Sequence, residues 1–83
     1  MIDLNEAKAK VTEALVADGV ELVQVSVVLK DMEEQIGVVI KTDQGRQGLR
    51  FKNSDDLTVD DIVDGSVTFL GDWYRRAVEH NSP

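Results

Sequence analysis

The sequence predicts an α+β fold in which a three-stranded antiparallel sheet carries helices on one face. A helical pattern opens the chain, three segments of alternating apolar residues follow, and a second helical pattern closes it. The expected order is α-β-β-β-α, with a short extra helical turn before the last helix. All 83 residues (1–83) are expected to form a single domain, because a chain of this length has no room for a second core.

The first helix is expected over residues 4–18. Its apolar residues recur at helical spacing at Leu4, Ala7, Val11, Ala14 and Leu15. Asp3, followed three residues later by Glu6, has the pattern of a capping box. Gly19 suits the position directly after a helix C-terminus.

Alternation with a period of two predicts a three-stranded meander after this helix. The first strand is expected over residues 20–30, and a polar turn over 31–34 leads into the second. The second and third strands are joined over 42–45, where Gly45 is free to take a positive φ. The residues expected to face the core are Val23, Val25, Val27, Leu29, Ile36, Val38, Ile40, Leu49 and Phe51.

The opposite face of the sheet is expected to be open. Leu22, Val28 and Val39 are placed there, so part of this face is expected to be covered by a second copy or a partner. A homodimer through this face or along a strand edge is therefore one prediction.

The C-terminal part predicts two helical pieces. Thr58 followed by Asp61 indicates an N-cap for a short turn, and Gly65-Ser66 is expected to break and restart the chain. The last helix is then expected over residues 66–79, with Phe69, Leu70, Trp73 and Ala77 at helical spacing. Its β-prone start leaves a short fourth strand before a helix at Asp72 as the alternative.

Composition favours a protein of the cytoplasm. The chain lacks cysteine, and its start shows no basic segment followed by an apolar run, which argues against a signal peptide. The net charge of -7 repels duplex DNA and anionic membranes at long range and favours a partner with a basic surface.

No catalytic constellation emerges from the sequence, so the chain is expected not to be an enzyme. The doublets Asp55-Asp56 and Asp60-Asp61 lack the spacing of a calcium loop, and neighbouring helical residues do not form a carboxylate pair. His80 lies close to the C-terminus, and the glycines form no phosphate-binding loop. No cofactor or metal is predicted.

Charge patterning instead predicts a protein-interaction domain. Five aspartates without an intervening Lys or Arg and a neighbouring pair on the last helix are the predicted partner-binding residues: Asp55, Asp56, Asp60, Asp61, Asp64, Tyr74 and Arg75. Tyr74 is expected to be exposed if Trp73 enters the core. The aspartates would bind a partner with a basic surface. In a sharper form of this hypothesis they mimic phosphates and block a nucleic-acid-binding protein, and a phage-type accessory or inhibitor protein is the class suggested by this size and acidity.

The alternative is a nucleic-acid-binding domain that uses the open sheet face. Its residues would be Lys41, Arg46, Arg50 and Lys52, with Lys30 nearby. This alternative is less favoured because sheets that bind single strands present stacking aromatic residues, and Phe51 is expected to point the other way.

The order α-β-β-β-α and the chain length resemble those of the double-stranded RNA-binding domain. That family binds phosphates through a lysine-rich cluster at the start of its last helix. This chain has Ser66-Val67-Thr68-Phe69-Leu70 at that place, after acidic residues. The resemblance therefore covers the order of elements and implies no RNA-binding residue, since fold does not imply function.

Overall fold

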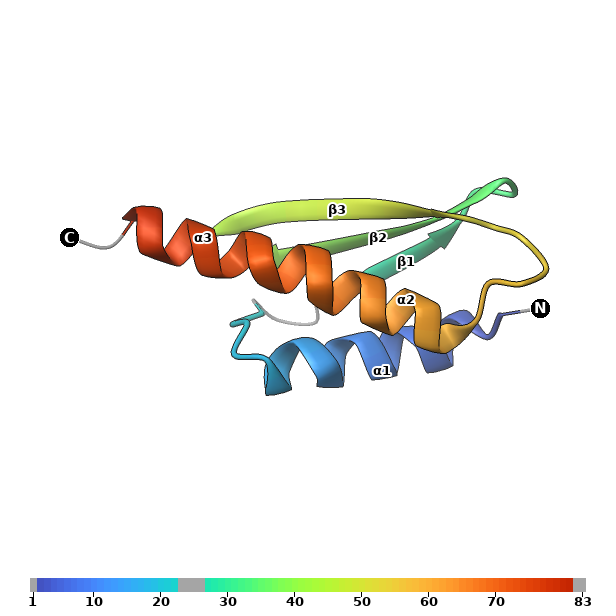
Figure 1. Ribbon diagram of the computed structural model, residues 1–83, viewed down its shortest axis with the longest axis horizontal. Coiled ribbons are helices and arrows are strands. Elements are labelled where there is room, and N and C mark those ends of the chain that lie inside the picture. Colours follow the sequence, from blue (N-terminus) through green and yellow to red (C-terminus); the bar gives the residue numbers. More distant parts are fainter. Residues whose placement is uncertain (1, 23–26, 82–83) are drawn as a thin grey trace.

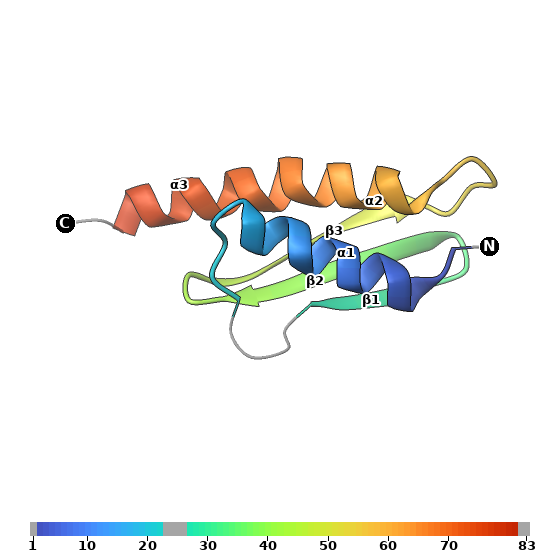
Figure 2. The same ribbon diagram turned by 90° about the horizontal axis from the view of Figure 1, so that it is seen from below.

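A computed structural model describes residues 2–22 and 27–81 and shows the predicted α+β architecture. Helix α1 (Leu4–Ala17) precedes strands β1 (Val28–Asp31), β2 (Gln35–Thr42) and β3 (Gly45–Lys52). Helix α2 (Val59–Ser66), the π-helical segment η1 (Val67–Gly71) and helix α3 (Asp72–Asn81) follow. The strands form one antiparallel sheet in the order β1-β2-β3, and the helices lie on one side of it (Figures 1 and 2). The predicted class, order and meander are confirmed.

Asp3 caps α1 and Gly19 follows its end, as predicted, although the helix ends at Ala17 and only the Asp3 side chain of the expected capping box forms its hydrogen bonds. The Asp3 carboxylate accepts hydrogen bonds from the backbone N–H groups of Asn5 and Glu6, which have no partner inside the helix. Gly19 follows the helix with φ at 92°, a conformation that glycine adopts without steric cost. Ala7, Val11 and Leu15 form the buried stripe of the helix.

The hairpin between β2 and β3 also follows the sequence. Thr42 pairs with Gly45, and Gly45 has φ at 113°. The Thr42 hydroxyl accepts from the Gln44 N–H and donates to the Gly45 carbonyl, which closes the turn.

The described part of the predicted first strand differs from the prediction at residues 22 and 27, which lie outside β1. Pairing with β2 begins at Val28, and residues 23–26, with the predicted core positions Val23 and Val25, lie outside the described residues. The placement of Leu22 on the open face is wrong: Leu22 is half-buried against the core and forms a single bridge to Thr42. From residue 27 onward the alternation holds, because Val27 is buried and Val28 is exposed.

The predicted break at Gly65-Ser66 is wrong, and so is the alternative fourth strand. Thr58 and Asp61 form the predicted capping box, but the helical path then runs without interruption from α2 through η1 into α3 (Figure 2). Ser66 and Val67 both have right-handed helical dihedral angles. Gly65 is needed for a different reason, because a Cβ atom there would lie 2.5 Å from a ring carbon of Phe51.

The π segment explains which aromatic residue faces the core. Buried residues recur every four positions along this helical stretch, at Ile62, Ser66, Leu70 and Tyr74. In a regular α-helix residues four apart drift by about 40° per step, so this row would rotate away from the sheet. The π-helical segment has more residues per turn than an α-helix, so it cancels this drift. The buried row therefore keeps facing the sheet. Regular spacing predicts Trp73 in the core, whereas Trp73 is half-buried and Tyr74 is buried.

The core lies between the sheet and the helices. Among the described residues, ten buried side chains form it: Val11, Leu15, Val20, Val27, Ile36, Val38, Ile40, Ile62, Leu70 and Tyr74. Leu29, Leu49 and Phe51, predicted as core residues, are half-buried against this cluster. Phe69, expected to point inward, is 49% exposed.

Candidate functional site

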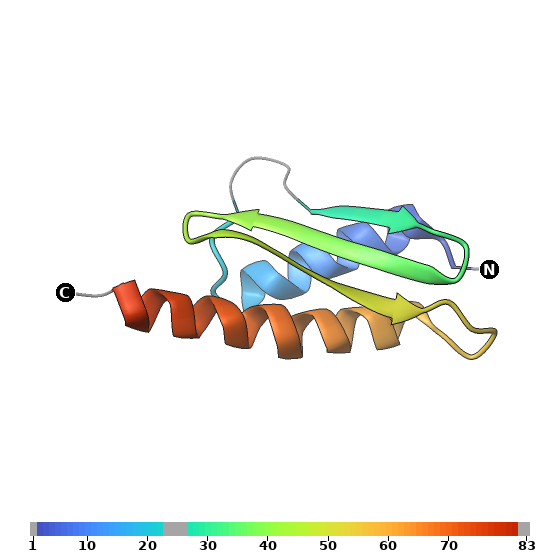
Figure 3. The same ribbon diagram turned by 90° about the horizontal axis from the view of Figure 1, so that it is seen from above.

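The face of the sheet opposite the helices is the most distinctive surface of the molecule. Figure 3 looks onto this outer face, which no helix in the described part of the chain covers. Strand register places ten residues on it: Val28, Lys30, Gln35, Gly37, Val39, Lys41, Arg46, Gly48, Arg50 and Lys52. Five of the ten are cations and none is acidic. A chain with net charge -7 therefore has one locally basic face.

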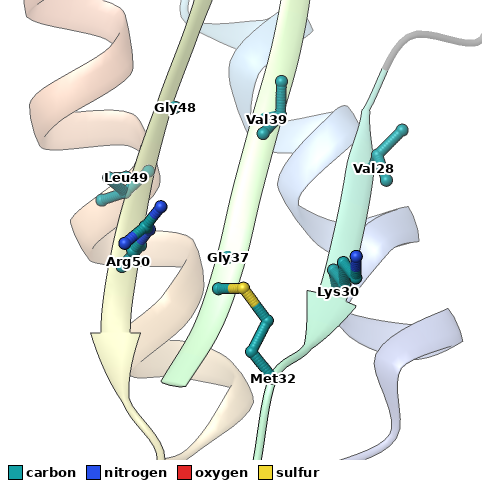
Figure 4. A pocket seen from close by; sticks show the side chains of 8 residues that line it. All are labelled: Val28, Lys30, Met32, Gly37, Val39, Gly48, Leu49 and Arg50. Carbon is teal, nitrogen blue, oxygen red and sulfur yellow. The ribbon is translucent and has the colours of Figure 1, made fainter. Parts of the chain in front are cut away.

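The centre of the outer face is hollowed. A depression of about 590 Å³ is lined by Val28, Lys30, Met32, Gly37, Val39, Gly48, Leu49 and Arg50. Lys30, Gly37 and Arg50 lie in register across the three strands, so the two cations stand on opposite sides of a glycine (Figure 4). With strands about 4.8 Å apart, the two cationic residues are separated by about 10 Å at the backbone. We call this depression the outer-face hollow.

Two glycines keep the hollow open. A Cβ atom at Gly48 would lie 2.9 Å from the Val38 carbonyl oxygen and 3.2 Å from a methyl carbon of Val39. A Cβ atom at Gly37 would lie 3.1 Å from the terminal methyl of Met32, whose side chain reaches toward this glycine (Figure 4). Methionine is flexible, so its side chain can move aside for a ligand.

The floor of the hollow is apolar and open to water. Val28 is 54% exposed, Val39 40% and Met32 36%. Exposed aliphatic side chains ringed by polar residues are typical of a protein-binding surface. Among the described residues of this face there is no aromatic side chain on which a base could stack.

The helices carry charged residues of both signs, whereas the ten outer-face residues of the strands carry only positive charge. On the helical side of the molecule, ion pairs join Lys10 to Glu6, Arg75 to Asp18 and Arg76 to Asp72. On the outer face Lys41 stands directly opposite Arg46. Two cations at opposed positions of an antiparallel pair add to the positive potential of this part of the face.

The predicted acidic residues lie in the β3–α2 turn and along α2. Asp55, Asp56, Asp60, Asp61 and Asp64 are all exposed. Asp61 has a structural role, because its carboxylate accepts a hydrogen bond from the Thr58 N–H at 3.0 Å. Asp60 lies close enough to Lys10 to help raise the pKa of that ammonium group, although the hydrogen bond with Glu6 is the larger cause.

Tyr74 and Arg75 bind other parts of the same chain. The expected exposure of Tyr74 is wrong: 6% of the residue is exposed, and its hydroxyl donates a 2.7 Å hydrogen bond to Asp43 in the β2–β3 turn. Burial raises the pKa of Tyr74, and the bond to Asp43 raises it further. Arg75 forms a 2.6 Å ion pair with Asp18. These contacts hold α3 against the ends of α1 and the hairpin.

Part of the hollow could have been found from the sequence. Glycines at outward positions of neighbouring strands, here Gly37 and Gly48, leave a depression wherever strand register brings them close. Met32 has the same parity as the outward residues Val28 and Lys30, but it follows the end of β1, so the alternation of the strand alone does not place it over Gly37.

No protein-family model matches this chain, and neither a curated protein nor a solved structure shows significant similarity to it. Within residues 2–22 and 27–81, no three acidic or histidine side chains are gathered to hold a metal ion. No helix in the same ranges has the length and apolar character needed to cross a membrane.

Proposed function

We propose that this protein is a non-enzymatic interaction domain that binds an anionic partner through the outer face of its sheet. The observation that carries the proposal is that five of the ten outward residues of the described strands are cations and none is a carboxylate, on a face that no described helix covers. An interaction surface of this kind accelerates association with a partner of opposite charge and selects against other partners.

Positive charge is concentrated on the outer face although the whole chain is negatively charged. Five of its nine Lys and Arg residues lie on the outer face, although acidic residues outnumber basic ones 16 to 9. Lys41 and Arg46, at opposed positions of β2 and β3, place two of these cations next to each other. Carboxylates or phosphates of a partner that approach this part of the face are attracted by both cations.

The predicted basic partner for Asp55, Asp56, Asp60, Asp61 and Asp64 stays a prediction, as does a role as a phage-type inhibitor. These carboxylates are exposed, and no feature of them besides charge points to a ligand. Tyr74 supports that interpretation less than expected, because it is buried and bonded to Asp43.

Titration of ¹⁵N-labelled protein with two defined anions tests the proposal. Oligo-glutamate and oligo-thymidylate of equal charge are added at low and high salt while backbone amide shifts are recorded. We expect shifts on β1, β2 and β3 that weaken as salt screens the charges. Arg50→Gln combined with Lys52→Gln weakens binding, whereas Arg76→Gln, which removes an exposed cation from α3, does not.

Absence of shifts with both anions at millimolar concentration contradicts the proposal. Shifts that map to α1 or α3 also contradict it, because they locate the anion site on the helical side.

A further inference from the structure

We propose that the partner is an acidic protein segment that places an aliphatic side chain in the outer-face hollow. This inference rests on the proposed function, since it names the class of anion that the outer face binds. It follows from three features of the hollow: its flanking charges, its floor and its length.

The flanking charges fit a short segment with carboxylates on both sides of one apolar residue. Lys30 and Arg50 are separated by two strand spacings, with Gly37 between them. Neither cation has an ion-pair partner among the described residues. Both side chains are free to close on carboxylates beside an apolar group seated over Gly37 (Figure 4).

The floor selects a protein over a nucleic acid. Val28, Val39 and Met32 offer aliphatic surface, which gains free energy by burying another apolar side chain. A nucleic acid has no aliphatic groups of this kind and depends on stacking when it binds a sheet. The phosphates of a nucleic acid would bind the cations of the outer face, but its apolar centre would stay exposed to water.

The length of the basic surface also favours a short segment. On β3 the cations run from Arg46 to Lys52, about 20 Å at the rise of an antiparallel strand. Directly beyond Lys52 the chain turns into Asn53 and Ser54 and reaches Asp55 and Asp56. A long polyanion that continues past β3 meets these carboxylates and is repelled, whereas a segment of a few residues ends before them.

Two synthetic peptides and an oligonucleotide separate the alternatives. The first peptide is an acidic nonapeptide with leucine at two central positions, and the second has serine at both. Oligo-thymidylate of equal charge is the third probe. Affinities are measured by calorimetry, and binding is located by amide shifts. We expect the leucine peptide to bind about tenfold more tightly than the serine peptide, which matches partial burial of its side chains.

Variants of the hollow test the apolar contact without changing charge. Val28→Ser with Val39→Ser should reduce affinity for the leucine peptide by about tenfold and for the serine peptide by less than about twofold. Gly37→Val should have the same selective effect because the new side chain fills the hollow and displaces Met32. Both residues in the first variant are exposed at least 40%, so the core is not changed and the fold is checked by the amide spectrum.

The outcomes distinguish three possible ligands of the outer face: an acidic protein segment, a nucleic acid and a second copy of the chain. Equal affinity for the two peptides, with shifts still on the outer face, overturns the acidic-segment proposal and leaves the proposed function standing. Tighter binding of the oligonucleotide than of either peptide, unaffected by Gly37→Val, assigns the face to nucleic acid. Self-association that Arg50→Gln abolishes assigns it to a second copy. No shift on the outer face with any probe overturns the proposed function as well.

Discussion

Replacing Gly65 with alanine tests the contact between α2 and the edge of the sheet. In an isolated helix this substitution gains about 1 kcal/mol, because alanine loses less conformational freedom than glycine. Here the new Cβ atom would lie 2.5 and 2.7 Å from two ring carbons of Phe51, well inside ordinary van der Waals distance. Forcing an extra methyl into such a contact costs about 1–3 kcal/mol. The expected net effect is a loss of about 1 kcal/mol.

The matched background is Phe51→Leu, which removes those two ring carbons. In that background Gly65→Ala should stabilise the protein by about 1 kcal/mol, so the coupling between the two sites is about 2 kcal/mol. Urea unfolding followed by the fluorescence of Trp73, the single tryptophan, measures all four proteins. At a urea dependence of about 1 kcal/mol per molar, the midpoint shifts are about 1 M in opposite directions. Equal stabilisation by alanine in both backgrounds would refute the steric reasoning.

Three further predictions concern hydrogen bonds. Ser66→Ala should leave stability unchanged or raise it by about 1 kcal/mol in urea unfolding, because the buried Ser66 hydroxyl has no hydrogen-bond partner among the residues that the structure describes. A loss of about 1 kcal/mol would show that this hydroxyl does form a hydrogen bond in the folded protein. Thr58→Ala should cost about 1 kcal/mol in the same assay because it removes the capping box of α2. Tyr74, the single tyrosine, should ionise above pH 10 when its absorbance is followed at 295 nm. Since folding raises this pKa, the stabilisation is complete below pH 10 and declines as pH rises further, and Tyr74→Phe should remove that decline.

The sequence predicts the first half of the fold well because local signals and tertiary packing agree there. Asp3 and Gly19 end α1, Gly45 shapes the hairpin, and alternation distinguishes buried Val38 from exposed Val39. Each of these features depends on residues close in sequence. Local patterns of this kind carry enough information to place an element and orient its faces.

The C-terminal helix could not be predicted in the same way because its shape depends on distant contacts. From the sequence, Gly65 is expected to break the helix. In the structure it lies within the helix, where the ring of Phe51 leaves no room for a larger residue. The π turn shifts the inward face by one residue, so Tyr74 replaces Trp73 in the core and bonds to Asp43, 31 residues away. The basic outer face was predicted from the alternation, whereas the hollow also needed strand register and the position of Met32.

Salt dependence distinguishes partner binding from the predicted homodimer. A symmetric dimer through the outer faces would bring two sets of five cations together, and their repulsion opposes the gain from burying Val28 and Val39. Added salt screens that repulsion and would strengthen such a dimer, whereas it weakens binding of an acidic segment to the same cations. Sedimentation should therefore show a monomer at low salt, where the acidic leucine peptide binds most tightly. A dimer that dissociates when salt is added would contradict this reasoning, because its interface would join the outer face to an acidic surface of the other copy.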